Sequence, residues 1–340
     1  MGLDIQLLDY DVMYYNQALI KYKKSINSLK SYGIILCFEA DVPKAKDMTT
    51  HQFEINLLHD SSETYPDFGA TVLRLTFNFE PEEYTSLREN NVTFKEGRNS
   101  KLIIRTVGSR NLDLDSPAET HTNPIGQTGV HINVVIIAAQ HFYNISVNGG
   151  DFIHYHHRFP PWAVNHVMIT GDIKDVKFEE DSSHCQKIIN NSIKFELPPN
   201  MMEVKPLTDL ETIVITGKIS KFPINVIFLN GAIERHNRIG QVVLDFALSQ
   251  NDIYIESKSK GRNAGNTTKL LPHQLELKEG EAIQLNFHGK MESISFEIET
   301  KEDTHANLFI SLMPYTATHY VMVEGLEKIK EYNLIDLQRN

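Results

Sequence analysis

Short runs of alternating apolar and polar residues fill most of the chain, and they constrain its fold more than any other feature. In residues 71–77, leucine and phenylalanine side chains alternate with Arg74 and Thr76. A period of two is typical of a strand with one buried face. Runs of this kind recur between turn residues, with almost no helical pattern. The sequence therefore predicts an all-β protein built from antiparallel β-sandwiches.

Each half of the chain contains a similar series of predicted strands. In the first half they are residues 33–38, 52–57, 71–77, 101–105, 132–137, 142–147, 151–159 and 167–173. In the second half they are residues 212–217, 222–228, 241–246, 253–257, 283–287, 293–298, 308–312 and 320–325. Two local matches link the halves: Phe53-x-Ile55-Asn56 with Phe222-x-Ile224-Asn225, and Val167-Met168-Ile169-x-Gly171 with Val321-Met322-Val323-x-Gly325. Matching elements in the same order predict a duplicated domain.

The length of 340 residues suits two domains of ordinary size. We place an N-terminal arm or short amphipathic helix at residues 1–30 and the first domain at 31–180. A linker rich in proline and polar residues follows at 181–208, and the second domain occupies 209–337. The first domain carries two polar insertions, 80–99 and 111–123, which we interpret as surface loops.

Composition and charge exclude several classes of protein. A net charge of −11 argues against binding to nucleic acid or to an anionic membrane through a general electrostatic field. No apolar run approaches the length of a membrane span, and the first residues lack a signal-peptide pattern. We expect a cytoplasmic protein, with export by a leaderless route as the alternative. For Cys37 and Cys185 we favour free buried thiols over a bridge.

Residues 142–160 resemble the late hairpin of galectins, and residues 164–173 resemble the final strand of that family. Val147-Asn148-Gly149 ends one predicted strand as the family's Val-Asn-Gly does, and His157-Arg158-Phe159-Pro160 is similar to its His-Arg-Leu-Pro. The ending Gly171-Asp172 and the early run 53–57 also resemble galectin strands. The resemblance implies two galectin-type, jelly-roll-like sandwiches without catalytic activity. It also implies β-galactoside binding by His, Asn, Arg and Glu, with a Trp stacked on the sugar.

The galectin sugar motif is incomplete in the first domain. On the strand that begins with Leu73 and Arg74, Thr76 stands where the family has His, Asn78 matches, and Glu80 stands where it has Arg. A carboxylate in place of a guanidinium removes hydrogen-bond donors and reverses the charge. Our candidate sugar-binding residues in this domain are Arg74, Thr76, Asn78 and Glu80.

The motif is more degenerate in the second domain. Asp245, Ala247 and Ser249 replace the His, Asn and Arg. No Trp occupies the stacking position in either half, and Tyr254, with Tyr84 in the first domain, is the substitute that we suggest. Our candidate residues in this domain are Asp245, Ser249 and Tyr254.

Three other patterns receive a structural interpretation. His121-Thr122-Asn123-Pro124-Ile125 imitates the sugar motif but lies in a turn-rich stretch, and we regard it as a coincidence. Trp162 follows two prolines, and we interpret it as a loop anchor at a sandwich edge. His154 and His156 share a strand face, but two histidines without further ligands do not predict a metal site.

Nucleophile, phosphate-loop and metalloprotease motifs are absent from the sequence, so we predict no catalytic residues, metal or cofactor. The first functional hypothesis is a lectin that binds glycans or glycoconjugates, with two sites if both halves are active. The alternative is an interaction module that kept the sandwich, lost the sugar and binds a protein partner. Fold alone does not decide between them.

Overall fold

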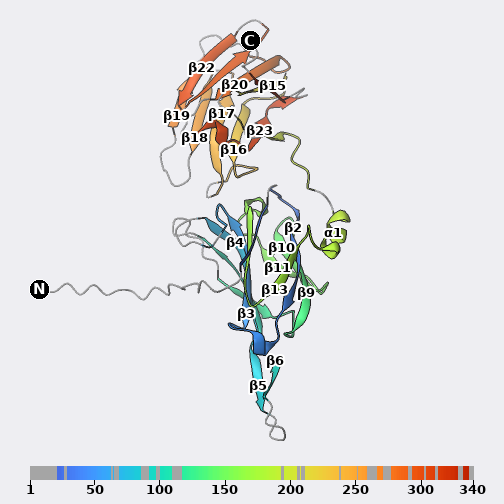
Figure 1. Ribbon diagram of the computed structural model, residues 1–340. Coiled ribbons are helices and arrows are strands. Elements are labelled where there is room, and N and C mark those ends of the chain that lie inside the picture. The colour runs from blue at the N-terminus through green and yellow to red at the C-terminus, as the bar shows by residue number, and fades with distance from the viewer. Residues whose placement is uncertain are drawn as a thin grey trace, which may run out of the picture.

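The structure is a computed structural model. It describes residues 21–336 apart from 27–28, 63, 65–68, 86–91, 97–99, 109–116, 193–194, 205–206, 208–210, 237–238, 251, 259–265, 271–276, 290–292, 302–303, 311–312 and 328–331. Two β-sandwiches lie end to end (Figure 1), and each consists of two antiparallel sheets. The predicted all-β class and the two tandem sandwiches are confirmed.

The first sandwich contains strands β1 to β13. Their bounds are β1 Lys21–Ser25, β2 Gly33–Val42, β3 Gln52–His59, β4 Ala70–Asn78, β5 Pro81–Thr85, β6 Val92–Glu96, β7 Lys101–Val107, β8 Glu119–Thr122, β9 Val130–Ala138, β10 Phe142–Val147, β11 Ile153–His156, β12 His166–Gly171 and β13 Lys174–Phe178. One sheet has the order β1-β12-β3-β4-β7-β8 and the other β11-β10-β9-β2-β13. Strands β5 and β6 form a separate hairpin that projects from the sandwich (Figure 1).

Helix α1, Ser183–Asn190, follows the first sandwich, and strands β14 to β25 build the second. Their bounds are β14 Met201–Glu203, β15 Glu211–Ile219, β16 Ile224–Asn230, β17 Gln241–Leu248, β18 Ile253–Lys258, β19 Asn266–Leu270, β20 Ala282–Gly289, β21 Ser293–Glu299, β22 Thr304–Ile310, β23 Tyr320–Glu324, β24 Leu326–Glu327 and β25 Tyr332–Asp336. The sheets have the orders β14-β23-β16-β17-β18-β19 and β22-β21-β20-β15-β24, with β25 also paired to β15.

The two halves share one topology. In each, an N-terminal strand pairs with the last long strand, which pairs in turn with the first of four consecutive strands of that sheet (β1-β12-β3 and β14-β23-β16). The sequence match of residues 167–171 with 321–325 falls on the equivalent strands β12 and β23. The match of residues 53–56 with 222–225 is out of register, because Gly171 contacts Phe53 whereas Gly325 contacts Ile224. The shared order supports the duplication inferred from the sequence.

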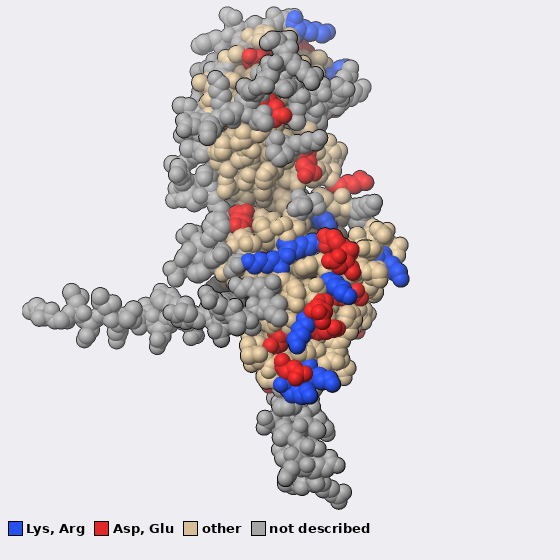
Figure 2. Space-filling model, viewed as in Figure 1, with Lys and Arg blue, Asp and Glu red and all other residues tan. Residues whose placement is uncertain are grey.

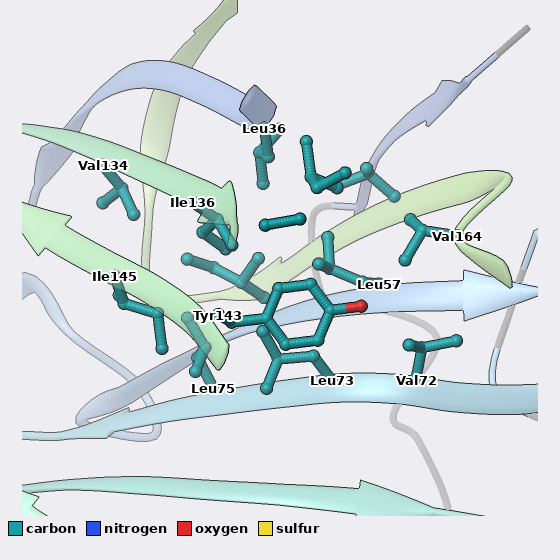
Figure 3. Packing of buried hydrophobic residues seen from close by; sticks show 14 of the residues in the cluster. Leu36, Leu57, Val72, Leu73, Leu75, Val134, Ile136, Tyr143, Ile145 and Val164 are labelled. Carbon is teal, nitrogen blue, oxygen red and sulfur yellow. The ribbon is translucent and has the colours of Figure 1, made fainter. Parts of the chain in front are cut away.

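Side chains of period two fill the space between the sheets. On β4, Leu73, Leu75 and Phe77 are fully buried, and Figure 3 shows leucine side chains of this strand facing Ile136 and Ile145 of the opposite sheet. Tyr143 lies among these aliphatic groups. Its hydroxyl has no hydrogen-bond partner among the described residues, and burial raises the pKa of the phenol.

The strands that the sequence did not predict are short and polar. Residues 21–25, assigned to an arm, form the edge strand β1 with Lys21, Lys23 and Lys24, and pair with β12. The predicted helix around residues 12–20 lies outside the described residues. His121, assigned to a turn, belongs to edge strand β8. Edge strands need no continuous apolar pattern, and charged side chains suit them.

The prediction of free thiols is wrong. Cys37 of β2 and Cys185 of α1 form a disulfide with Cα atoms 5.7 Å apart. The residues are 148 positions apart in sequence, and they meet because α1 packs against Ile34 of β2 and Val135 of β9. Ser182 caps this helix by accepting a hydrogen bond from the Cys185 backbone N–H.

The two sandwiches meet through a continuous apolar contact. The buried cluster of the first sandwich extends into the second through residues of β14, β16, the loop after β16 and β23: Met201, Ile227, Leu229, Ala232, Ile233, Ile239 and Tyr320. A cavity of about 320 Å³ lies beside this junction, with Leu29, Tyr32, Phe195 and Tyr320 in its walls. Contact of this kind is typical of a defined interface between domains.

Candidate functional site

The polar face of β4 collects three of the four residues predicted in the first domain. Arg74, Thr76 and Asn78 alternate with core residues and therefore lie on the same side of the sheet. The register places Asn56 of β3 opposite Arg74 and Glu54 opposite Thr76. Period-two reasoning correctly grouped the three residues on this face.

These polar groups hydrogen-bond mainly to one another. Arg74 Nε donates to Asn56 Oδ1 at 2.8 Å and lies 4.0 Å from a Glu54 carboxylate oxygen. The Thr76 hydroxyl donates to Glu54 Oε1 at 3.1 Å. Arg74 is 8% exposed, Thr76 is 9% exposed and Asn56 is fully buried. A ligand would have to displace internal bonds to use these groups, which favours a structural role for the network.

Asn78 and Glu80 lie at the end of this face. The Asn78 carbonyl accepts a hydrogen bond from Asn123 Nδ2, and the Glu80 backbone N–H donates to the Ser100 hydroxyl. Glu80 is exposed and follows the end of β4, immediately before the hairpin of β5 begins. Asn123 also accepts from the Ile125 N–H, so it orders a turn.

The polar face of β17 is more open. Asp245 and Ala247 alternate with the buried Phe246 and Leu248, and the register sets Glu256 opposite Asp245 and Tyr254 opposite Ala247. Tyr254 is 39% exposed, which is unusual among the large apolar side chains of this protein. Ser249 lies beyond the strand, where its backbone N–H donates to the Asp252 carbonyl.

A residue that sequence reasoning missed completes this second face. Arg235, in the loop between β16 and β17, places Nη2 2.5 Å from Asp245 Oδ1. The Arg235 side chain is 48% exposed and that of Asp245 is 11% exposed. An exposed tyrosine, a carboxylate and a guanidinium thus meet on one sheet face. This is the combination of apolar platform, acceptor and donor that recognises a polyol.

The remaining candidates have structural positions. Trp162 is 1% exposed and lies at the junction of the two sandwiches, so the edge-anchor interpretation was incomplete. His154 Nδ1 lies 2.7 Å from Asn144 Oδ1, and the described residues contain no group of three or more metal-ligating side chains. Tyr84 is in β5, and the position of its side chain lies outside what the structure describes. In the described part of the chain, no helix is long and apolar enough to cross a membrane.

Charges of both signs alternate over the first sandwich. Figure 2 shows lysine and arginine side chains interspersed with aspartate and glutamate on the face in view. Lys24 contributes ion pairs with Glu179 and Glu180. Mixing of charges weakens the long-range electrostatic field over this face.

Comparison with known proteins points to one family. The model of the galactoside-binding lectin family matches residues 24–178. Sheep galectin-11 in complex with glycerol has 13% identity, with 46% of this chain and 96% of that chain covered and a TM-score of 0.32. Congerin II liganded with lactose and MES has 15% identity, 47% and 100% coverage and a TM-score of 0.33. Ancestral congerin has 16% identity, 46% and 99% coverage and a TM-score of 0.32. No curated protein sequence matches the chain.

Proposed function

The chain belongs to the galectin family through the domain at residues 24–178, and from this premise we propose that it is a lectin whose glycan site is the polar face of β17 and β18. Galectins are lectins and not enzymes. The observation that carries the proposal is the exposed ring of Tyr254 on the same face as Asp245. Galactose-containing glycans are the first ligands to test.

The geometry around Tyr254 fits one sugar ring. Ala247 lies directly opposite the tyrosine on the neighbouring strand, and its small side chain leaves room above the sheet. Asp245 on β17 is the diagonal neighbour of Tyr254 on β18, and diagonal neighbours on adjacent strands lie roughly 7–8 Å apart. A pyranose stacked on the ring would therefore place its hydroxyls within reach of the carboxylate. Stacking supplies buried area, and the carboxylate supplies orientation.

The first-domain face is the weaker candidate. Its central groups already bond to one another, and the faces of β3, β4 and β7 opposite the core present no aromatic side chain within the described residues. These facts favour a second function for this domain, an interaction module that binds a protein. Phe152, 48% exposed beside the β10–β11 turn, is the side chain best placed to contact such a partner.

Titration calorimetry of the intact chain with lactose and N-acetyllactosamine, preceded by a glycan array, tests the proposal. Tyr254→Ala should abolish glycan binding, and Asn78→Ala should leave it unchanged with one glycan bound per chain. Loss of binding in Asn78→Ala alone would transfer the site to the first domain. No glycan bound by a folded chain, on the array or at millimolar sugar, would leave the interaction module as the function.

A further inference from the structure

The loop between β16 and β17 connects the two sandwiches through neighbouring residues. Glu234 Oε1 accepts a hydrogen bond from Trp162 Nε1 of the first sandwich at 2.7 Å. The next residue, Arg235, donates to Asp245 on the polar face of the second sandwich at 2.5 Å. One residue of the loop therefore reaches into the junction, and its neighbour reaches over the candidate sugar site.

The first sandwich holds this loop in place. Ala232, Ile233 and Ile239 are buried in the same apolar cluster as Trp162. His236 meets the Trp162 ring edge-on, with ring centroids 6.1 Å apart. A Cβ added at Gly240 would lie 3.4 Å from the Trp162 ring and 2.5 Å from Ala232 Cβ, which shows how closely the loop packs. The conformation that places Arg235 over Asp245 thus depends on contacts outside its own domain.

From this arrangement we propose that Arg235 is a sugar-contacting residue of the second-domain site and that Trp162, in the first domain, is a positioning residue that acts through Glu234. The inference rests on the proposed lectin function. It assigns the site a hydrogen-bond donor that comes from a loop and not from a strand of the sheet.

The chemistry of the pair suits vicinal hydroxyls. The Asp245 carboxylate accepts hydrogen bonds, and the guanidinium donates from a planar fork, so adjacent hydroxyls of one sugar can bond to both. About half of the Arg235 side chain is exposed, which leaves donors available to a ligand. Because Asp245 holds the guanidinium in place, little side-chain entropy remains to be lost on binding.

A glycan array of the full-length chain, followed by titration calorimetry with the glycan that binds best, is the test. Arg235→Ala should weaken binding of that glycan by about tenfold, as expected for loss of one charged hydrogen bond. Arg235→Lys should recover only part of this, because an ammonium lacks the fork.

Positioning by Trp162 is tested at the partner residue. Glu234→Ala and Trp162→Phe, which loses the indole N–H, should each weaken glycan binding several-fold, while Glu234→Gln keeps an acceptor oxygen and should bind nearly as well as wild type. Leu308→Ala, at an exposed position of β22 in the other sheet of the second sandwich, is the control. Thermal unfolding identifies variants that fail to fold. Binding abolished by Tyr254→Ala but untouched by Arg235→Ala would overturn the inference and leave the lectin function intact. A wild-type chain that binds no glycan would overturn both.

Discussion

The Cys37–Cys185 bridge makes a quantitative prediction about stability. It closes a loop of 148 residues that contains almost the whole first sandwich. The loop-closure entropy removed from the unfolded chain corresponds to about 5 kcal/mol for a loop of this length, and loss of native bridges costs roughly 2–5 kcal/mol. We expect the double variant Cys37→Ala, Cys185→Ala to be destabilised within this range.

The local effect should be largest at α1. An eight-residue helix does not hold its shape alone. Without the bridge, its contact with β2 depends on buried apolar groups such as Ile34 and on the hydrogen bond from Ser182 to Glu39. Amide exchange should therefore accelerate in α1 before it does in the strands of the core.

Urea denaturation followed by far-ultraviolet circular dichroism and by fluorescence of the single tryptophan measures the change. Trp162 is buried at the junction, so its emission reports on that contact. Reduced wild type should lose as much stability as the double variant, and the double variant should not respond to reductant. A wild-type midpoint that ignores reductant, or two thiols titrated in the unfolded, unreduced chain, would refute the reasoning. Since disulfides persist in oxidising compartments, a confirmed bridge would favour an extracellular location over the cytoplasm.

Three further predictions concern single residues. Tyr143→Phe should leave the stability unchanged or raise it by up to about 1 kcal/mol in urea denaturation, because it removes a buried hydroxyl without a described partner. Burial lowers the pKa of His157 to about 4, whereas the pKa of histidine in an unfolded chain is about 6.5. Between these two values the unfolded chain binds more protons than the folded one. The stability should therefore fall as the pH falls from about 6.5 to about 4. Thermal unfolding across this range should show a weaker pH dependence in His157→Gln than in the wild type. Gly289→Ala would place a Cβ 1.8 Å from the buried Tyr315 ring, and we expect a loss of about 3 kcal/mol or more in the second-domain transition.

Local alternation predicted the long strands because each has one face in a core. This alternation is visible on β4, where the core face carries Leu73, Leu75 and Phe77 and the opposite face carries Arg74 and Thr76. Edge strands β1 and β8 have no such constraint. Lys-Tyr-Lys-Lys-Ser and Glu-Thr-His-Thr are specified by pairing with a neighbour, and that pairing depends on residues outside the strand itself.

The features that matter most to the candidate site are the least local. Arg235 lies in a loop without periodic signal, and its partner Asp245 was chosen only because it fills a family position. Trp162 and Glu234 are 72 residues apart and belong to different sandwiches. The bridge from Cys37 to Cys185 spans still more of the chain. Contacts of this range follow from packing of completed domains, so spacing in the sequence does not reveal them.

Duplication explains why the two copies diverged in different ways. With two sandwiches in one chain, neither face alone has to preserve the ligand chemistry, and the substitutions follow different physics. On β4, Arg74 donates a hydrogen bond to Asn56 and lies beside Glu54, so these polar groups are engaged with one another and less accessible to a ligand. On β17 the strand residues lost the family's donors, but Arg235 supplies one from a loop that the first sandwich holds in place. The first domain would then contribute to glycan binding through Trp162, which holds the loop of Arg235, and less through its own β4 face. Separating the two domains would therefore disable the second-domain site, although the first domain makes no contact with the sugar.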